Sequence, residues 1–297
     1  MSSQEPWLLT AAEVLPLLRE DKLTVTDYVK SLLERVQARD PEVKAWAWIE
    51  PSLILQQAKE LDGLSVSERG PLSGLPIAVK DVILTKDMPT QYNSRLYESE
   101  TPIGIDANCI ITLRAQGALI LGKTSTTEFA SSKQVIWHQN LRGTLATRNV
   151  PIALGTQTGG SIVRPASFDG CYGFKPTTVL YRVKAWRSGV HLLADTFRLK
   201  DNEVASSKSS SKSSSLQGAK IGFCKTHNWS KAGQGTIDAM AKAQNILTTH
   251  GGQVEDVELP NEFSRVLDWH ADVLVGEGQT SFLGQYLLDK DKLHESI

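Results

Sequence analysis

The chain has 297 residues, of which 40% are hydrophobic, and a formal net charge of −1 at pH 7. This length and composition allow a sizeable core, in one large α/β domain or in two smaller domains. The balanced charge gives no electrostatic footprint for nucleic acid or for an anionic membrane, so neither is expected as a partner. Three widely spaced cysteines indicate no disulfide framework and no metal cluster, which makes the reducing cytoplasm the expected location.

The first 65 residues predict a layer of helices. The N-terminus lacks the basic start and continuous apolar core of a signal peptide, and no apolar run reaches membrane-spanning length. Thr10 and Glu13 form a capping box at the start of the first helix. An apolar stripe predicts a second helix over 26–39, and Pro51 opens a third over 51–61. The apolar stripes of the first two helices favour a core, with a partner surface as the alternative.

Strands and helices alternate in the prediction for the next segment. The stretch GLPIAVKDVI predicts a buried strand that ends at Lys80, although a lysine after a strand is ordinarily a solvated surface charge. The stretch ANCIITLRAQ predicts a helix with Asp106 as its N-cap and Gly117 as its terminator, followed by a strand over 118–121. Helices and strands at this spacing favour an α/β fold with a partly parallel sheet.

A glycine-rich loop follows a third predicted strand, over 150–154. The loop carries Ser161 directly behind Gly159 and Gly160. Two glycines beside a serine let backbone N–H groups converge on one point, which suits an anion cradle or an oxyanion hole next to a nucleophile. A turn whose glycines serve only backbone geometry is the alternative.

Beyond residue 200 the sequence predicts a connector and a further helix and strand unit. Residues 201–217 contain the run SSKSSSKSSS, which has nothing to bury and predicts a flexible connector. A strand over 219–229, a helix capped by Thr236 and a strand over 253–260 follow. His270 is expected on the surface or in a groove of one more helix. It is not expected to be a metal ligand, because no second histidine or cysteine lies at metal-ligand spacing.

The string ALGTQTGGSIVRPASFDGCYGFKPT, residues 153–177, closely resembles the core of the amidase signature family. The members of this family are serine hydrolases that cleave carboxamides through an acyl-enzyme. GLPIAVKDVI resembles the family too, and GKTSTTEFA resembles the loop that lines its substrate entrance, where Glu128 either contacts substrate or caps a helix. The resemblance implies one domain over 1–297, with a mixed sheet flanked by helices that is incomplete at the C-terminus. Within it, residues 66–200 are the signature core and 218–297 the remainder.

The resemblance also implies a catalytic apparatus. Ser161 is the implied nucleophile, Lys80 the general base, and Thr158, Gly159, Gly160 and Ser161 supply the N–H groups of an oxyanion hole. A serine hydroxyl must pass its proton to a base during attack, and only a neutral amine accepts it. Lys80 is therefore expected to be buried, with a lowered pKa. The implied partner is a small-molecule amide, with no cofactor or metal, and no particular oligomeric state is indicated.

One part of the family pattern is absent. Family members hold a second serine in a cis peptide, within a Gly/Ser-rich segment, and that serine relays the proton. Residues 130–149 lack such a segment, so none of the hydroxyls there is assigned as the relay: Ser131, Ser132, Thr144 and Thr147. A segment after residue 196 and the C-terminal third of the family are also missing, which suggests a truncated, alternatively spliced or mis-predicted gene product.

Three functions follow from these observations. The first is an amidase that hydrolyses a small carboxamide. The second is a relative that keeps the fold but has lost turnover, since removing one member of an interdependent nucleophile unit can cost on the order of 10⁴ in rate. The third is a nucleotide-binding module in which GTQTGGS cradles phosphate, although Ser161 stands where a P-loop needs lysine.

Overall fold

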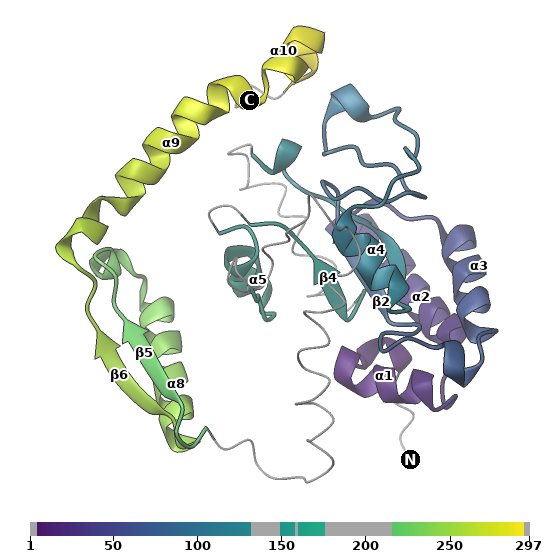
Figure 1. Ribbon diagram of the computed structural model, residues 1–297, viewed down its shortest axis with the longest axis horizontal. Coiled ribbons are helices and arrows are strands. Elements are labelled where there is room, and N and C mark those ends of the chain that lie inside the picture. Colours follow the sequence, from purple (N-terminus) through teal and green to yellow (C-terminus); the bar gives the residue numbers. More distant parts are fainter. Residues whose placement is uncertain (1–4, 132–148, 158–159, 176–215, 294–297) are drawn as a thin grey trace. The chain divides into compact units, whose positions relative to one another are not determined.

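The computed structural model describes residues 5–131, 149–157, 160–175 and 216–293, shown as coloured ribbon in Figure 1. The chain divides into two compact units, one formed by residues 1–200 with 285–297 and the other by residues 201–284. The single-domain organisation stays a prediction. None of the helices in the described ranges is long and apolar enough to cross a membrane.

The first unit is organised around a four-stranded mixed sheet in the order β1-β3-β2-β4. Its strands are β1 (Trp46–Trp48), β2 (Pro76–Lys80), β3 (Leu119–Thr124) and β4 (Ile152–Leu154). Strand β2 runs parallel to β3 and to β4, whereas β1 runs antiparallel to β3. β2 and β3 are buried along their whole length, as expected for strands covered on both faces. The predicted α/β fold with a partly parallel sheet is confirmed.

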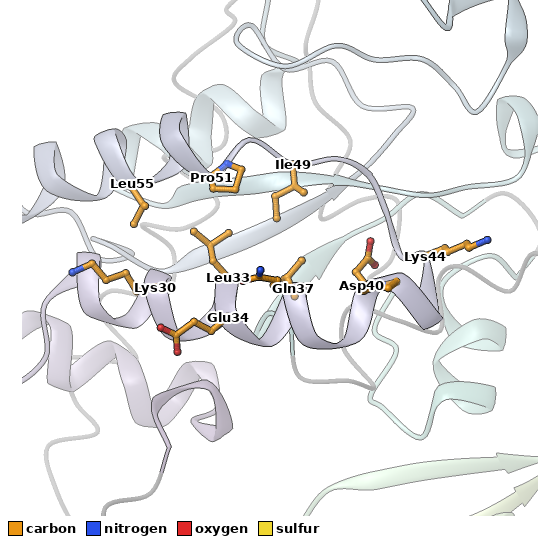
Figure 2. Close-up of a pocket in the computed structure, with 11 residues that line it drawn as sticks. Lys30, Leu33, Glu34, Gln37, Asp40, Lys44, Ile49, Pro51 and Leu55 are labelled. Atoms are coloured by element: carbon orange, nitrogen blue, oxygen red, sulfur yellow. The ribbon is translucent and has the colours of Figure 1, made fainter.

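Three N-terminal helices belong to this unit: α1 (Ala11–Arg19), α2 (Val25–Val43) and α3 (Pro51–Asp62). The predicted capping box is present, since the Thr10 backbone N–H donates to Glu13 Oε2 at 2.8 Å. Helix α2 continues to Val43, past its predicted end at residue 39. It ends there because Lys44 adopts the left-handed conformation. A groove of about 850 Å³ lies between α2 and α3, and Figure 2 shows the side chains from both helices that line it.

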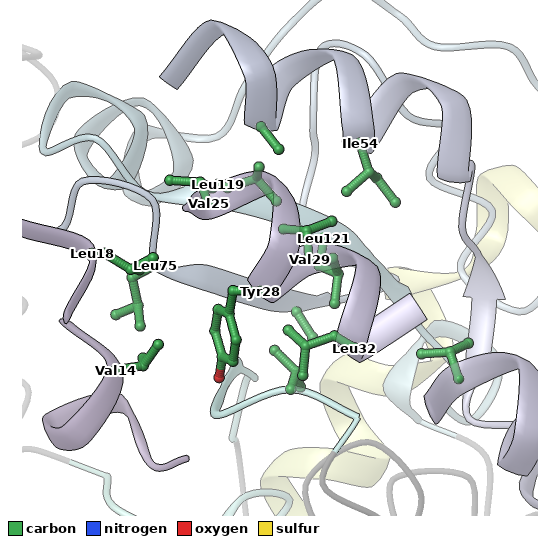
Figure 3. Close-up of a cluster of buried hydrophobic side chains, with 14 of the residues drawn as sticks. Val14, Leu18, Val25, Tyr28, Val29, Leu32, Ile54, Leu75, Leu119 and Leu121 are labelled. Atoms are coloured by element: carbon green, nitrogen blue, oxygen red, sulfur yellow. The ribbon is translucent and has the colours of Figure 1, made fainter. Parts of the chain in front are cut away.

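The larger hydrophobic core packs α1, α2 and α3 against one face of the sheet, as Figure 3 shows. The buried side chains of α2 are Val25, Tyr28, Val29, Leu32 and Val36. They repeat at intervals of three and four residues, so they form one stripe of the helix. Fully burying one such side chain stabilises the fold by about 1.5–3 kcal/mol.

A smaller core covers the other face of the sheet and includes α4 (Asn108–Ala115). Its buried members are Val79, Ile83, Met88, Ile110 and Ile120. The prediction of Asp106 as the N-cap of α4 is wrong, because Ala107 occupies that position. The Asp106 carboxylate instead accepts a hydrogen bond from the Lys86 backbone N–H at 2.7 Å and pairs with Arg114 at 3.2 Å. Asp106 therefore joins the loop before α4 to the last turn of the helix.

The second unit contains a strand, a helix and a strand: β5 (Lys220–Cys224), α8 (Gln234–Thr249) and β6 (Gln253–Val257). The two strands pair in parallel, which requires a crossover such as α8 between them. Gly233, and not the predicted Thr236, is the N-cap of α8, so Thr236 lies inside the first turn. Helices α9 (Val266–Ser281) and α10 (Leu283–Asp289) follow in sequence, and His270 is exposed on α9 as predicted.

Candidate active site

The carboxyl ends of the three parallel strands meet at one edge of the sheet. Lys80 is in register with Thr124 at the end of β3, and Val79 is in register with Leu154 at the end of β4. Ligands of open α/β sheets bind at this edge, because the loops that leave the strands converge there. The edge therefore brings Lys80 next to the loop that follows β4.

Lys80 is buried, with only 2% of its surface exposed, so the alternative of a solvated surface lysine is wrong. Its Nζ donates a hydrogen bond to Thr156 Oγ1 at 2.9 Å. Among the residues that the structure describes, no carboxylate lies within ion-pair distance of Lys80. Burial lowers the pKa of Lys80, because the charged ammonium loses its hydration and gains no anionic partner. The side chain thus has the environment that a neutral amine base requires.

The next residue, Asp81, has its own partner. Its carboxylate lies 3.4 Å from Lys123 Nζ and accepts hydrogen bonds from the backbone N–H groups of Gln91 and Asn93 at 3.2 and 3.4 Å. Burial raises the pKa of Asp81 and lowers the pKa of Lys123, while their mutual attraction opposes both shifts. Because the Asp81 carboxylate is paired with Lys123, it does not serve as a counter-ion for Lys80.

The loop after β4 is closed by the side chain of Gln157. Its Oε1 accepts hydrogen bonds from the backbone N–H groups of Ile162 and Val163 at 2.8 and 3.0 Å. Ser161 precedes this closure and is partly exposed. Helix α5 (Val163–Asp169) begins directly afterwards. The loop therefore returns the chain near Ser161 to the end of β4, where Thr156 contacts Lys80.

Close packing behind this loop explains one glycine. A Cβ on Gly173 would lie 2.7 Å from the Cβ of Ala166, closer than real Cβ atoms approach, and 3.0 Å from the Cα of Val163, a tight contact. Gly160 differs, since a Cβ there would lie 3.8 Å from Arg164 Cβ, an ordinary contact. Packing against the described residues therefore does not demand glycine at position 160.

The oxyanion-hole assignment stays a prediction. Thr158 and Gly159 lie outside the described residues, as do Ser132, Thr144 and Thr147 of the relay interval. Ser131 is described and is exposed. The contact that the structure shows is therefore between Lys80 and Thr156, in the loop that carries Ser161.

Glu128 lies in a neighbouring loop and is 6% exposed. It is the first residue of a 3₁₀ turn, Glu128–Ala130, whose N-cap is Thr127, so Glu128 lies in the first turn and is not itself the N-cap. Its carboxylate accepts a hydrogen bond from Ser94 Oγ at 2.6 Å, which ties this turn to the loop after β2. Contact of Glu128 with substrate stays a prediction.

The two loops joined by Ser94 and Glu128 also share a cluster of aromatic rings and several residues with strained backbone conformations. The rings of Tyr92, Tyr97 and Phe129 lie 5.2–6.0 Å apart, and the Phe129 backbone N–H donates to the Tyr92 carbonyl at 2.9 Å. Tyr92, Asn93, Phe129 and Ala130 all adopt positive φ between 49° and 58°. Such conformations cost on the order of 1 kcal/mol or more for bulky residues, and they concentrate near functional sites.

The groove between α2 and α3 does not coincide with this edge of the sheet. Its lining residues include none of the candidate catalytic residues. The buried Lys80 is at the strand ends, whereas the groove is lined by residues of α2 and α3 and by Lys44 and Ile49 between these helices (Figure 2). We therefore place the candidate site at the strand ends.

Thr156 is the site residue that the sequence prediction missed. It is the second residue after β4, and its hydroxyl is the partner of Lys80. The signal that could have found it is the rule that parallel strands place their carboxyl ends together, which relates residues just after 154 to residues near 80.

Comparison with known proteins identifies the family. A family model described as Amidase matches residues 27–135 and 144–183, about half of the chain. The chain therefore belongs to the amidase family.

Individual curated proteins also match this chain in sequence. A glutamyl-tRNA(Gln) amidotransferase subunit of Rhodopirellula baltica is 27% identical over 301 residues, which cover 86% of this chain and 60% of the relative. The corresponding protein of Maridesulfovibrio salexigens is 35% identical over 184 residues, 56% of this chain and 38% of the relative. The chain thus spans 60% or less of the length of these two curated relatives.

Solved structures show the same fold. The structure of native peptide amidase from Stenotrophomonas maltophilia matches with a TM-score of 0.67 and 25% identity, covering 87% of this chain and 64% of that chain. A chain of a vestigial protein complex, described with the evolutionary origins of an s-triazine catabolic enzyme, matches with a TM-score of 0.72 and 21% identity, covering 97% and 71%. The predicted fold class, a mixed sheet flanked by helices of the amidase-signature type, is confirmed.

Proposed function

We propose that this chain carries the acyl-transfer centre of an amide hydrolase, with Ser161 as the nucleophile and Lys80 as the general base. The observation that carries the proposal is the state of Lys80. It is buried, has no anionic partner among the described residues, and contacts the loop that leads to Ser161. A lysine buried without a counter-ion is destabilising, and such groups are characteristic of catalytic sites.

The proposed reaction begins with attack of Ser161 Oγ on the carbonyl carbon of a carboxamide, while its proton moves to neutral Lys80. Backbone N–H groups of residues 158–161 are the proposed donors to the oxygen of the tetrahedral intermediate. The intermediate expels ammonia or an amine, which takes the proton back from the Lys80 ammonium. Water then hydrolyses the acyl-enzyme with the same base, releasing a carboxylate and restoring Ser161. No cofactor takes part in this scheme.

We propose a small-molecule carboxamide as the substrate class and the cytoplasm as the location. The proteins that this chain resembles include a peptide amidase and an amidotransferase subunit, which supports an amide as the group attacked. Glu128 lies in the loop that follows β3, at the same end of the sheet as Lys80, and is the proposed substrate contact.

A second candidate function is an amidase-like protein without turnover. The observation that favours it is the identity of the hydroxyl beside Lys80. That hydroxyl belongs to Thr156, and no Gly/Ser-rich segment is present in residues 130–149 to supply the usual relay serine. In this case the fold persists while the nucleophile is not activated.

A fluorophosphonate probe distinguishes the two candidates without presuming a substrate. An activated serine Oγ attacks the phosphorus and expels fluoride, and peptide mass mapping locates the adduct. We expect labelling at Ser161 that is lost in Ser161→Ala and in Lys80→Met. Matched controls are Ser167→Ala and Lys86→Met, which alter an exposed serine of α5 and an exposed lysine and should label normally. A folded protein that remains unlabelled supports the candidate without turnover.

A further inference from the structure

We propose that the hydroxyl of Thr156 carries the proton between Ser161 and Lys80, in place of the relay serine that this chain lacks. The inference rests on the proposed function of Ser161 and Lys80. It assigns a catalytic role to a residue for which the resemblance implied none.

The contact between Thr156 and Lys80 is held by the sheet. Val79 and Leu154 are paired in register on the adjacent parallel strands β2 and β4, and Lys80 and Thr156 follow them closely. The Nζ and Oγ1 atoms are 2.9 Å apart, which is within the range for proton transfer along a hydrogen bond. Because threonine is β-branched, its hydroxyl is restricted to few positions, so the contact is oriented.

The closure by Gln157 relates Thr156 to Ser161. Gln157 directly follows Thr156 in the chain, and Ile162, whose N–H it accepts at 2.8 Å, directly follows Ser161. The hydrogen bond therefore joins the two residues that directly follow Thr156 and Ser161 in the chain. The relay requires that this closure bring Ser161 Oγ within hydrogen-bond reach of Thr156 Oγ1.

Two other described serines, in the loops that follow β2 and β3, have hydrogen-bond partners of their own. Ser125 Oγ donates to the Lys44 carbonyl at 3.2 Å, and Ser94 Oγ donates to Glu128 at 2.6 Å. Ser131 is exposed at the end of the turn that follows β3. Among the described residues, Thr156 is the one whose hydroxyl is hydrogen-bonded to Lys80.

The proposed relay conserves protons. When Ser161 Oγ attacks, its proton passes to Thr156 Oγ1, and the original Thr156 proton passes to the neutral amine of Lys80. Ser161 loses one proton, Lys80 gains one, and Thr156 ends with the proton count with which it began. The same transfers in reverse deliver the proton to the leaving amine.

The test compares Thr156→Val with Thr156→Ser in the full chain, by the rate of fluorophosphonate labelling at Ser161. Valine keeps the shape and removes the hydroxyl, and we expect labelling at neutral pH to fall by about 10²–10⁴-fold, the usual contribution of proton transfer. Serine retains the hydroxyl and should restore the rate to within about tenfold. Thr248→Val, which removes an exposed hydroxyl from α8, is the matched control and should label as wild type.

The pH profile separates a relay from simple positioning. The wild-type labelling rate should rise with the deprotonation of Lys80, and this inflection should vanish in Thr156→Val. A proton inventory on wild-type protein in mixtures of H₂O and D₂O requires no variant. Two protons in motion predict a curved dependence of the rate on deuterium fraction.

The outcomes distinguish this inference from the function on which it rests. Ser161 labelling in Thr156→Val at the wild-type rate, with the inflection retained, overturns the relay and leaves the hydrolase proposal standing. A linear proton inventory does the same. If folded wild-type protein is not labelled at Ser161, the proposed function fails, and the relay fails with it.

Discussion

Lys123 Nζ lies 3.4 Å from the carboxylate of Asp81, and both side chains are almost fully buried, at 0% and 1% exposure. The pair joins the end of β3 to the residue directly after β2. Lys123 also donates to the Pro89 carbonyl at 3.2 Å, while Asp81 accepts from two backbone N–H groups of the same loop. The pair therefore holds the loop after Lys80 against the strand ends.

Removing one member of this pair should be costly, because it leaves the other charge buried and uncompensated. We expect Lys123→Met to lower the free energy of unfolding by about 3–5 kcal/mol. Urea unfolding followed by circular dichroism measures this change. Lys86→Met, at an exposed lysine, should change it by less than about 0.5 kcal/mol. A loss below about 1 kcal/mol in Lys123→Met would show that the pair is not structural.

Lys80 should make stability depend on pH in the direction opposite to a salt-bridged lysine. In the unfolded chain it titrates near the ordinary lysine pKa of about 10.4, whereas burial lowers its pKa in the folded protein. The unfolded chain therefore binds more protons between the two pKa values, and stability falls as pH falls through this window. We expect wild type to lose stability relative to Lys80→Met as pH drops from about 10.4 toward neutrality.

Differential unfolding of these two proteins in urea across that pH range isolates the effect of Lys80, because all other titrating groups are shared. An unchanged difference between the two proteins would mean that Lys80 keeps its ordinary pKa in the folded state. The proposed general base would then be protonated at neutral pH.

Gln157 should matter more for reactivity than for folding. Gln157→Leu removes the acceptor for two backbone N–H groups, so the loop at Ser161 loses its closure. A misplacement of about 1 Å can reduce a reaction rate by about 10²-fold, and we expect a loss of this order in fluorophosphonate labelling. Gln157→Glu retains the acceptor oxygens and should recover most of the rate. Equal labelling of the leucine and glutamate variants would exclude a role for this closure.

Gly122 should tolerate no side chain. A Cβ there would lie 2.8 Å from the ring of Trp46 and 2.8 Å from the Trp48 carbonyl oxygen, where β1 packs on β3. We expect Gly122→Ala to destabilise the protein by about 1–3 kcal/mol through overpacking. Gly235→Ala is the matched control in α8, where a Cβ meets no atom within 4 Å. The midpoints of thermal unfolding of the two variants should therefore differ, and coinciding midpoints would contradict the packing argument.

Local patterns predicted the elements well where one short-range interaction decides the outcome. The capping box at Thr10 and the strand that ends at Lys80 are examples, since each depends on residues within a few positions. The caps at Asp106 and Thr236 were wrong, because the N-caps are Ala107 and Gly233, neither of which offers a side-chain acceptor that marks a helix start in the sequence. Helix and strand identity was therefore more predictable than helix ends.

The relationships within the site were less accessible from sequence. The contact of Lys80 with Thr156 joins residues 76 positions apart, and the pairing of Asp81 with Lys123 depends on which strands are neighbours. The resemblance indicated Lys80 and Ser161 individually, but strand order decides which hydroxyl approaches the amine. That order is a property of the assembled sheet, and no local periodicity encodes it.

The short strand β4 stands at one end of the sheet order and pairs, within the described residues, with β2 alone. Three residues joined to one neighbour can separate without the rest of the sheet opening, so the free energy of this local opening should lie below that of global unfolding. The backbone amides of β4 should then exchange with solvent hydrogen faster than those of β3. The loop of Ser161 is attached to this strand, so warming should abolish reactivity before it melts the helices.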